Sequence, residues 1–117
     1  MAVLDLLLVK EYITSTETVN TDFTTDAKDI TFKQDAFSIQ FTYNNGSSVN
    51  MEVYLEVSSD GVNFAKIEDS ATVLTEPDGG VIWDLKDSGT NWMRIAFEVT
   101  AGSIDVTNAA IYMRRNH

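Results

Sequence analysis

The clearest hydrophobic pattern in the chain is the alternation of apolar and polar residues that leads up to a Ser-Ser-Asp-Gly segment. Its apolar members are Met51, Val53, Leu55 and Val57. A period of two predicts a strand with one buried face. Residues 58–61 supply turn chemistry, because serine and aspartate side chains satisfy a turning backbone and glycine accepts a positive φ. Apolar residues resume at Val62, Phe64 and Ile67, so residues 49–67 are predicted to form a β-hairpin.

Similar patterns predict strands elsewhere in the chain. Residues 37–43 alternate around Ile39 and Phe41, and residues 71–75 and 81–85 are shorter candidates. Residues 91–100 would place Met93, Ile95, Phe97 and Val99 on the core face. The last strand, residues 103–115, is interrupted at 108–110, as a bulge would do. Glycine, asparagine, proline and serine at 44–48, 76–80, 86–90 and 101–102 predict turns between these strands, so that successive strands pair as hairpins.

The first 32 residues are less regular. Residues 2–9 are apolar almost without a break, which predicts a strand buried on both faces, although Val3, Leu4, Leu7 and Leu8 also fit a helix. Residues 12–29 are rich in threonine and aspartate and are predicted to be an extended edge segment or a loop, with a short strand at 17–23. Residues 30–32 begin the next strand.

These elements add up to about eight or nine short strands without an internal helix. The predicted fold is all-β: a single antiparallel β-sandwich over residues 1–117, resembling a jelly roll. Residues 1–29 form its N-terminal strand and polar segment, a candidate arm for subunit contact.

The amino-acid composition argues against several classes of function. The net charge of −10 argues against nucleic-acid binding and against an anionic membrane surface. The apolar start is not expected to be a signal peptide, because no basic segment precedes it and Asp5 interrupts it. There is no cysteine, which excludes disulfides and thiolate chemistry, and the only histidine is His117. No nucleophile, general base or cofactor motif stands out, so we expect no enzymatic activity and no cofactor.

Two weaker functional hypotheses remain. Glu68, Asp69, Glu76 and Asp78 lie in predicted loops and are candidate calcium ligands, but no EF-hand spacing is present and turn aspartates need no metal. Tyr54 and Trp92 lie on the polar faces of their strands and are candidates for stacking against a glycan. Core filling or a subunit contact explains such aromatic residues equally well, and Trp83, which shares a face with Val81 and Leu85, is assigned to the core.

Residues 54–64 (YLEVSSDGVNF) together with residues 92–97 (WMRIAF) resemble a pattern in small β-sandwich virion proteins of tailed bacteriophages. There a strand ends in an Asp-Gly turn, an aromatic residue follows, and a late strand carries an arginine among apolar residues. The resemblance covers about residues 49–115. It implies a structural virion component, such as a head-decoration, head-fibre or tail-associated protein, made in the host cytoplasm. The same turn occurs in carbohydrate-binding sandwiches.

We therefore expect a non-enzymatic assembly protein that binds further copies of itself and other virion proteins. A carbohydrate-binding module, assisted by calcium, is the alternative. The subunit contact is placed at the first strand, through Val3, Leu4, Leu6 and Leu8, because an uncovered apolar edge strand promotes aggregation. Arg94, on the face opposite to the core, is expected to form either a surface ion pair or a contact between subunits.

Overall fold

The computed structural model describes residues 4–11, 15–29, 36–86 and 91–116, and within them the chain is almost entirely β-strand. The strands are β1 (Leu4–Glu11), β2 (Glu17–Val19), β3 (Phe23–Thr24), β4 (Lys28–Asp29), β5 (Ala36–Ser58), β6 (Ala65–Lys66), β7 (Thr72–Leu74), β8 (Gly79–Lys86) and β9 (Trp92–Asn116). A 3₁₀ turn, η1 (Glu68–Ser70), separates β6 from β7. No helix in this part of the chain is long and apolar enough to cross a membrane.

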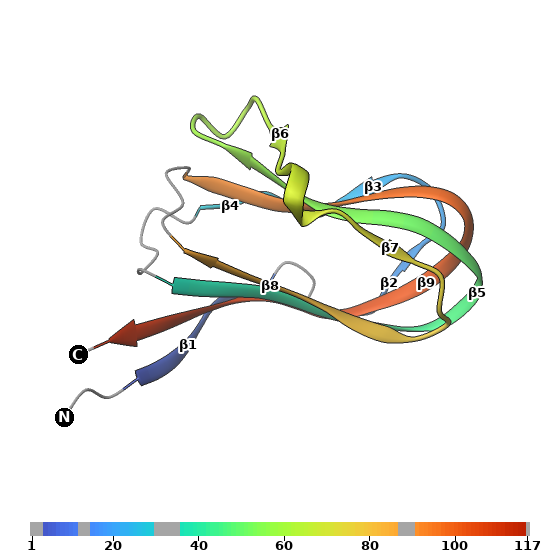
Figure 1. Cartoon of the computed structure of the whole chain (residues 1–117), viewed down its shortest axis with the longest axis horizontal. Coiled ribbons are helices and arrows are strands. Elements are labelled where there is room, and N and C mark those ends of the chain that lie inside the picture. Colours follow the sequence, from blue (N-terminus) through green and yellow to red (C-terminus); the bar gives the residue numbers. More distant parts are fainter. Residues whose placement is uncertain (1–3, 12–14, 30–35, 87–90, 117) are drawn as a thin grey trace.

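Two long, bent strands form the centre of the molecule. β5 and β9 pair antiparallel from Ala36 opposite Arg114 to Ser58 opposite Trp92. Figure 1 shows both strands curving together, so that each contributes one half to the lower layer and the other half to the upper layer. The register shifts near the bend, between Asn44 and Met51, and these irregularities allow the two strands to bend together and remain paired.

Shorter strands border this central pair on both sides. β8, β7 and β6 follow one another along the outer side of β5. β1, β2, β3 and β4 follow the outer side of β9 from its C-terminal end back to Trp92. The described strands of the N-terminal segment therefore form an interrupted edge that pairs with β9 at four places between Trp92 and Asn116.

This arrangement is a jelly roll. The sheet has four rows of strand: β1 to β4, then β9, then β5, then β6 to β8. The bend divides each row into two segments, and these eight segments are numbered in chain order. The layer that contains β1 then has the order 1-8-3-6, and the layer that contains β6 has the order 2-7-4-5. Adjacent segments are antiparallel, and the two layers face each other across the core. The predicted antiparallel, jelly-roll-like sandwich is confirmed.

Two of the predicted turns are wrong. Residues 44–48 and 101–102 do not end strands, because β5 and β9 continue through them. Positive φ angles at Asn45, Ser48 and Gly102 bend the backbone while its hydrogen bonding to the neighbouring strand resumes beyond the bend. Consequently, residues 37–43 and 51–58 lie in opposite layers and do not form a hairpin with each other.

The core lies between the layers and is filled by the residues that the alternation predicted. Met93, Ile95 and Phe97 are all at most 1% exposed. An aromatic group centred on Phe41 joins the layers, with ring centres 6.0 Å from Trp83 in its own layer and 5.4 Å from Phe97 in the opposite layer. The assignment of Trp83 to the core is confirmed. Val62, which continued the apolar spacing in the sequence, is 78% exposed because it lies in the turn after β5.

The N-terminal apolar segment is strand β1, so its helical alternative is wrong. The short strand predicted at 17–23 corresponds to β2 and the start of β3. The predicted irregularity at 108–110 is confirmed by a register shift opposite residues 40–42 and a φ of 53° at Asn108. The strand start predicted at residues 30–32 lies outside the described residues.

Candidate interaction surface

The predicted contact segment lies at an edge of the sandwich. β1 pairs antiparallel with the end of β9, with Leu4 opposite Asn116, Leu6 opposite Arg114 and Leu8 opposite Tyr112. Val3, the remaining residue predicted for the interface, lies outside the described residues. In Figure 1, β1 lies beside the C-terminal end of β9 at the border of the lower layer. Within the described part of the chain, β1 pairs with β9 alone.

The edges of the two layers differ in length. The layer that contains β6 is bordered by strands of two or three residues: β3 and β4 on one side, β6 and β7 on the other. The layer that contains β1 is bordered on one side by β8, and on the other by β1 and, nearer the bend, by the three-residue β2; β1 and β8 have eight residues each. Short, interrupted edge strands offer few consecutive backbone groups to another chain, whereas long ones offer a full row. Edge-to-edge contact is therefore favoured at β1 and β8.

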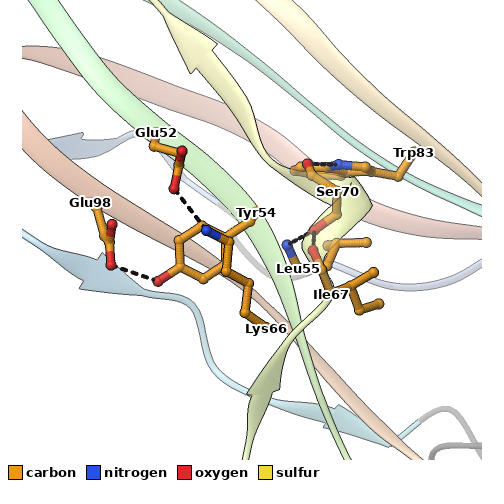
Figure 2. A network of polar contacts seen from close by, with 8 residues as sticks. All are labelled: Glu52, Tyr54, Leu55, Lys66, Ile67, Ser70, Trp83 and Glu98. Carbon is orange, nitrogen blue, oxygen red and sulfur yellow. Dashed lines mark hydrogen bonds and ion pairs between the residues drawn. The ribbon is translucent and has the colours of Figure 1, made fainter.

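The prediction that Tyr54 is exposed is wrong, since its side chain is only 7% exposed. Figure 2 shows the reason: its neighbours cover the ring on the outer face of β5. The ammonium group of Lys66 lies 4.5 Å from the ring centre and also contacts Glu52 at 3.0 Å. The Tyr54 hydroxyl donates a hydrogen bond to Glu98 at 3.1 Å. Burial, followed by this bond to a carboxylate, raises the pKa of Tyr54 to about 12.

Trp92, the second stacking candidate, is only partly exposed. Gly61, whose φ is 79°, lies directly against its indole: a Cβ on this glycine would be 3.0 Å from the ring. The face of Trp92 that could have stacked on a sugar is therefore partly occupied by the 58–61 turn. Tyr54 and Trp92 do not form an exposed aromatic platform.

The 58–61 turn is held by its own side chains, as the sequence predicted. The Asp60 carboxylate accepts hydrogen bonds from the backbone N–H groups of Val62 and Asn63, both at 2.8 Å. It also accepts one from the Ser58 hydroxyl at 2.8 Å. These bonds hold the pKa of Asp60 well below its usual range, with those from the backbone N–H of Asn63 and then of Val62 contributing most. Asp60 therefore has a structural role in the turn.

The four candidate calcium ligands belong to two separate elements. Glu68 and Asp69 lie in η1, and Glu76 and Asp78 lie in the turn between β7 and β8. Among the described residues, no three acidic or histidine side chains gather as a metal ion would require. Burial, and then the negative charges of Glu76 and Asp78, raise the pKa of the nearby Tyr43 hydroxyl.

Arg94 forms an ion pair within the chain. Its Nε lies 2.7 Å from Glu56, the residue directly opposite on β5, and its guanidinium lies 4.0 Å above the Phe64 ring. Of the two roles expected for Arg94, the surface ion pair is the one observed.

Sequence reasoning missed the role of Ser70. This buried serine ends η1, where its hydroxyl oxygen accepts a hydrogen bond from the Leu55 backbone N–H at 2.9 Å and donates one to the Ile67 carbonyl at 2.6 Å. Its own carbonyl accepts a bond from Trp83 Nε1 at 2.8 Å, as Figure 2 shows. A serine in an acidic, turn-like segment gives no sequence signal for this role.

No family model and no curated protein matches the chain. Among solved structures, the fold is similar to part of the enzymatically active domain of tailspike protein 4 from bacteriophage CBA120. The TM-score is 0.56 at 12% sequence identity, over 97% of this chain and 19% of that chain. The chain thus spans about a fifth of the length of that protein. A Family 16 Carbohydrate Binding Module-2 gives a TM-score of 0.47 at 7% identity, over 80% of this chain and 73% of that one, which is too distant to carry an argument.

Proposed function

We propose that this protein is a non-enzymatic structural component of a bacteriophage virion and that it acts as a symmetric homo-oligomer. We consider three such components: a head-decoration protein, a head-fibre protein and a tail-associated protein. The observation that carries the proposal is the long apolar edge strand β1, at the border of a layer in which every inner strand has two neighbours. A second chain that covers this edge would satisfy its backbone groups and remove an aggregation hazard.

Two further observations support this proposal. The jelly roll is similar in fold, over 97% of the chain, to part of a phage tailspike domain. In addition, several charged groups that could take part in chemistry are bound to each other. Arg94 pairs with Glu56, and Lys66 pairs with Glu52. Such cross-strand pairs tie neighbouring strands together, which suits a structural component.

The test is the absolute mass in solution, measured by light scattering behind a sizing column with and without calcium. The monomer mass is 13.0 kDa, so a dimer or larger ring is easily resolved. We expect a discrete oligomer whose mass does not depend on calcium. A monomer at every concentration would contradict the proposal, and an oligomer that needs calcium would redirect attention to the acidic loops. Peptide mass spectrometry of purified phage particles would then test the virion assignment directly.

The alternative function, a carbohydrate-binding module, has less support, because Tyr54 is buried and Trp92 packs against a turn. It can be tested separately by titrating tryptophan fluorescence against a panel of glycans. Trp92 is partly exposed and would report binding nearby. A saturable change with any glycan would favour this alternative over a purely structural role.

A further inference from the structure

The two long edges of the β1 layer are not equivalent. In β8, the apolar side chains of Val81 and Trp83 are each 8% exposed and belong to the core of their own chain. What β8 presents outward is Ile82, at 64% exposure, and the exposed carboxylate Asp84. A charged side chain on an edge strand discourages pairing with another chain, and Asp84 is the sixth of the eight residues of β8.

β1 has a different sequence pattern. Leu6, Leu7, Leu8 and Val9 are consecutive apolar residues. A run of apolar residues without polar alternation is typical of a strand that is covered on both sides, unlike the half-buried pattern of the other strands. The charged residues of β1 are Asp5, its second residue, and Lys10 and Glu11, its last two. β1 is therefore the edge whose sequence favours pairing with another chain.

An irregularity in β1 limits where this pairing can occur. The register against β9 shifts between Leu8 and Lys10, so the regular part of β1 runs from Leu4 to Leu8. A bulge bends the strand and interrupts its row of backbone groups. The midpoint of the regular part is Leu6. Two identical strands that pair antiparallel about a two-fold axis place one residue opposite its own copy, and the regular part is used in full only when that residue is Leu6.

The residues of β1 are compatible with this register. With Leu6 opposite its copy, Leu4 lies opposite Leu8 of the second chain and Asp5 lies opposite Leu7. No like charges face each other. A shift of the axis to Leu8 would place Asp5 opposite Glu11, which is unfavourable because like charges directly opposite each other destabilise a sheet.

We propose that two copies of this chain join by antiparallel pairing of their β1 strands about a two-fold axis at Leu6. The pairing builds one continuous layer in the order β8-β5-β9-β1-β1-β9-β5-β8. It rests on the proposed assembly function, for which it names the partner as a second copy and the contact as a sheet edge.

The register can be tested by disulfide formation, because the chain contains no cysteine. Leu6→Cys places two thiols directly opposite each other, about 5 Å apart between Cβ atoms. We expect this variant to form a disulfide-linked dimer under mild oxidation. The matched control is Leu7→Cys, whose two copies would be diagonal neighbours about 7–8 Å apart and poorly placed for a bond. Crosslinking at position 7 but not at 6, or at neither position, would overturn the proposed pairing.

A second pair of variants tests the contact without oxidation. Leu6→Lys brings two ammonium groups opposite each other and removes two leucines from the contact, so we expect association to weaken by at least about 100-fold. Ile82→Lys makes the same change of charge at the exposed edge strand β8 and should leave the dimer unchanged. Circular dichroism would confirm that both variants are folded. An Ile82→Lys variant that dissociates while Leu6→Lys does not would place the contact at β8 and overturn the proposal.

These experiments separate the two proposals. If the wild-type protein is an oligomer but Leu6→Cys does not crosslink and Leu6→Lys keeps its mass, the β1 contact is wrong and the assembly function stands. If the wild-type protein is a 13.0 kDa monomer at every concentration, both proposals fail.

Discussion

At the scale of single residues, Gly102 shows how the bend of β9 depends on the absence of a side chain. Its φ is 81°, and a Cβ at this position would clash with the backbone carbonyl oxygens of Ser47 and Ser48. At the bend, the two paired strands therefore approach each other more closely than a residue with a side chain would permit.

Gly102→Ala should lower the free energy of unfolding by about 2–4 kcal/mol, because it adds a left-handed backbone penalty to a clash with main-chain atoms. The measurement is the midpoint of urea unfolding. Gly80→Ala is the matched control. Its Cβ would be 3.4 Å from the nearest atom, an ordinary contact, and the change should stay within about 0.5 kcal/mol. Equal midpoints for the two variants would contradict this account of the bend.

Ser70 makes a contribution that depends on burial. Ser70→Ala leaves the buried Leu55 N–H without its acceptor, which should cost about 1–3 kcal/mol of stability. Ser59→Ala is the control, because Ser59 is exposed and its contact with Asn91 uses the backbone carbonyl. Urea unfolding of both variants tests this, and a Ser70→Ala protein as stable as Ser59→Ala would show that Leu55 finds another acceptor.

The raised pKa of Tyr54 predicts that the protein loses stability in alkaline solution. Its folded pKa is about 12, above the value of about 10 for an unfolded chain. The neutral hydroxyl therefore stabilises the fold fully below pH about 10, and this contribution is lost as the pH rises from about 10 toward 12. Unfolding free energies measured between pH 9 and pH 11.5, approximate limits chosen around these pKa values, should fall less steeply for Tyr54→Phe than for the wild type. Parallel curves would contradict the assignment; Tyr43→Phe, which leaves Tyr54 in place, should retain the Tyr54 component.

At the scale of elements, the two layers are held together by side chains from β5, β8 and β9. Phe41 lies at the centre of this contact, since its ring meets Trp83 on β8 and Phe97 on β9. It is 1% exposed, so its removal leaves a cavity between the layers.

Phe41→Ala should therefore destabilise the protein by about 3–5 kcal/mol. Ile82→Ala, on the neighbouring strand but 64% exposed, should cost no more than about 0.5 kcal/mol. Thermal unfolding followed by tryptophan fluorescence measures both, because Trp83 contacts Phe41. A loss below about 1 kcal/mol for Phe41→Ala would mean that the layers close around the missing ring.

At the scale of the whole molecule, the acidic charge opposes assembly. Each copy carries a net charge of −10, so two copies repel each other, whereas the proposed β1 pairing would hold them together through backbone hydrogen bonds and apolar contact. Raising the salt concentration from about 0.1 M to about 1 M shortens the screening length from about 10 Å to about 3 Å. We expect the dimer to become tighter over this range, as measured by sedimentation. A dimer that weakens with salt would instead indicate a contact built on ion pairs.

The sequence by itself determined the local structure. Alternation identified the core faces of residues 39–43, 51–57 and 93–99, because burial on one side of a strand requires a period of two. The Ser-Ser-Asp-Gly turn was equally readable, since its side chains bond to the backbone nearby. The jelly-roll class followed from the number and spacing of the strands.

Only the tertiary structure decided what depends on residues far apart in the chain. Residues 44–48 and 101–102 look like turns, yet they bend two strands that stay paired because each supplies the other's hydrogen bonds. Tyr54 alternates as an exposed residue, yet Lys66 and Glu98 cover it from other strands. The candidate contact divides in the same way. The apolar run of β1 is visible in the sequence, but its place at the edge of the described sheet depends on which strands become its neighbours.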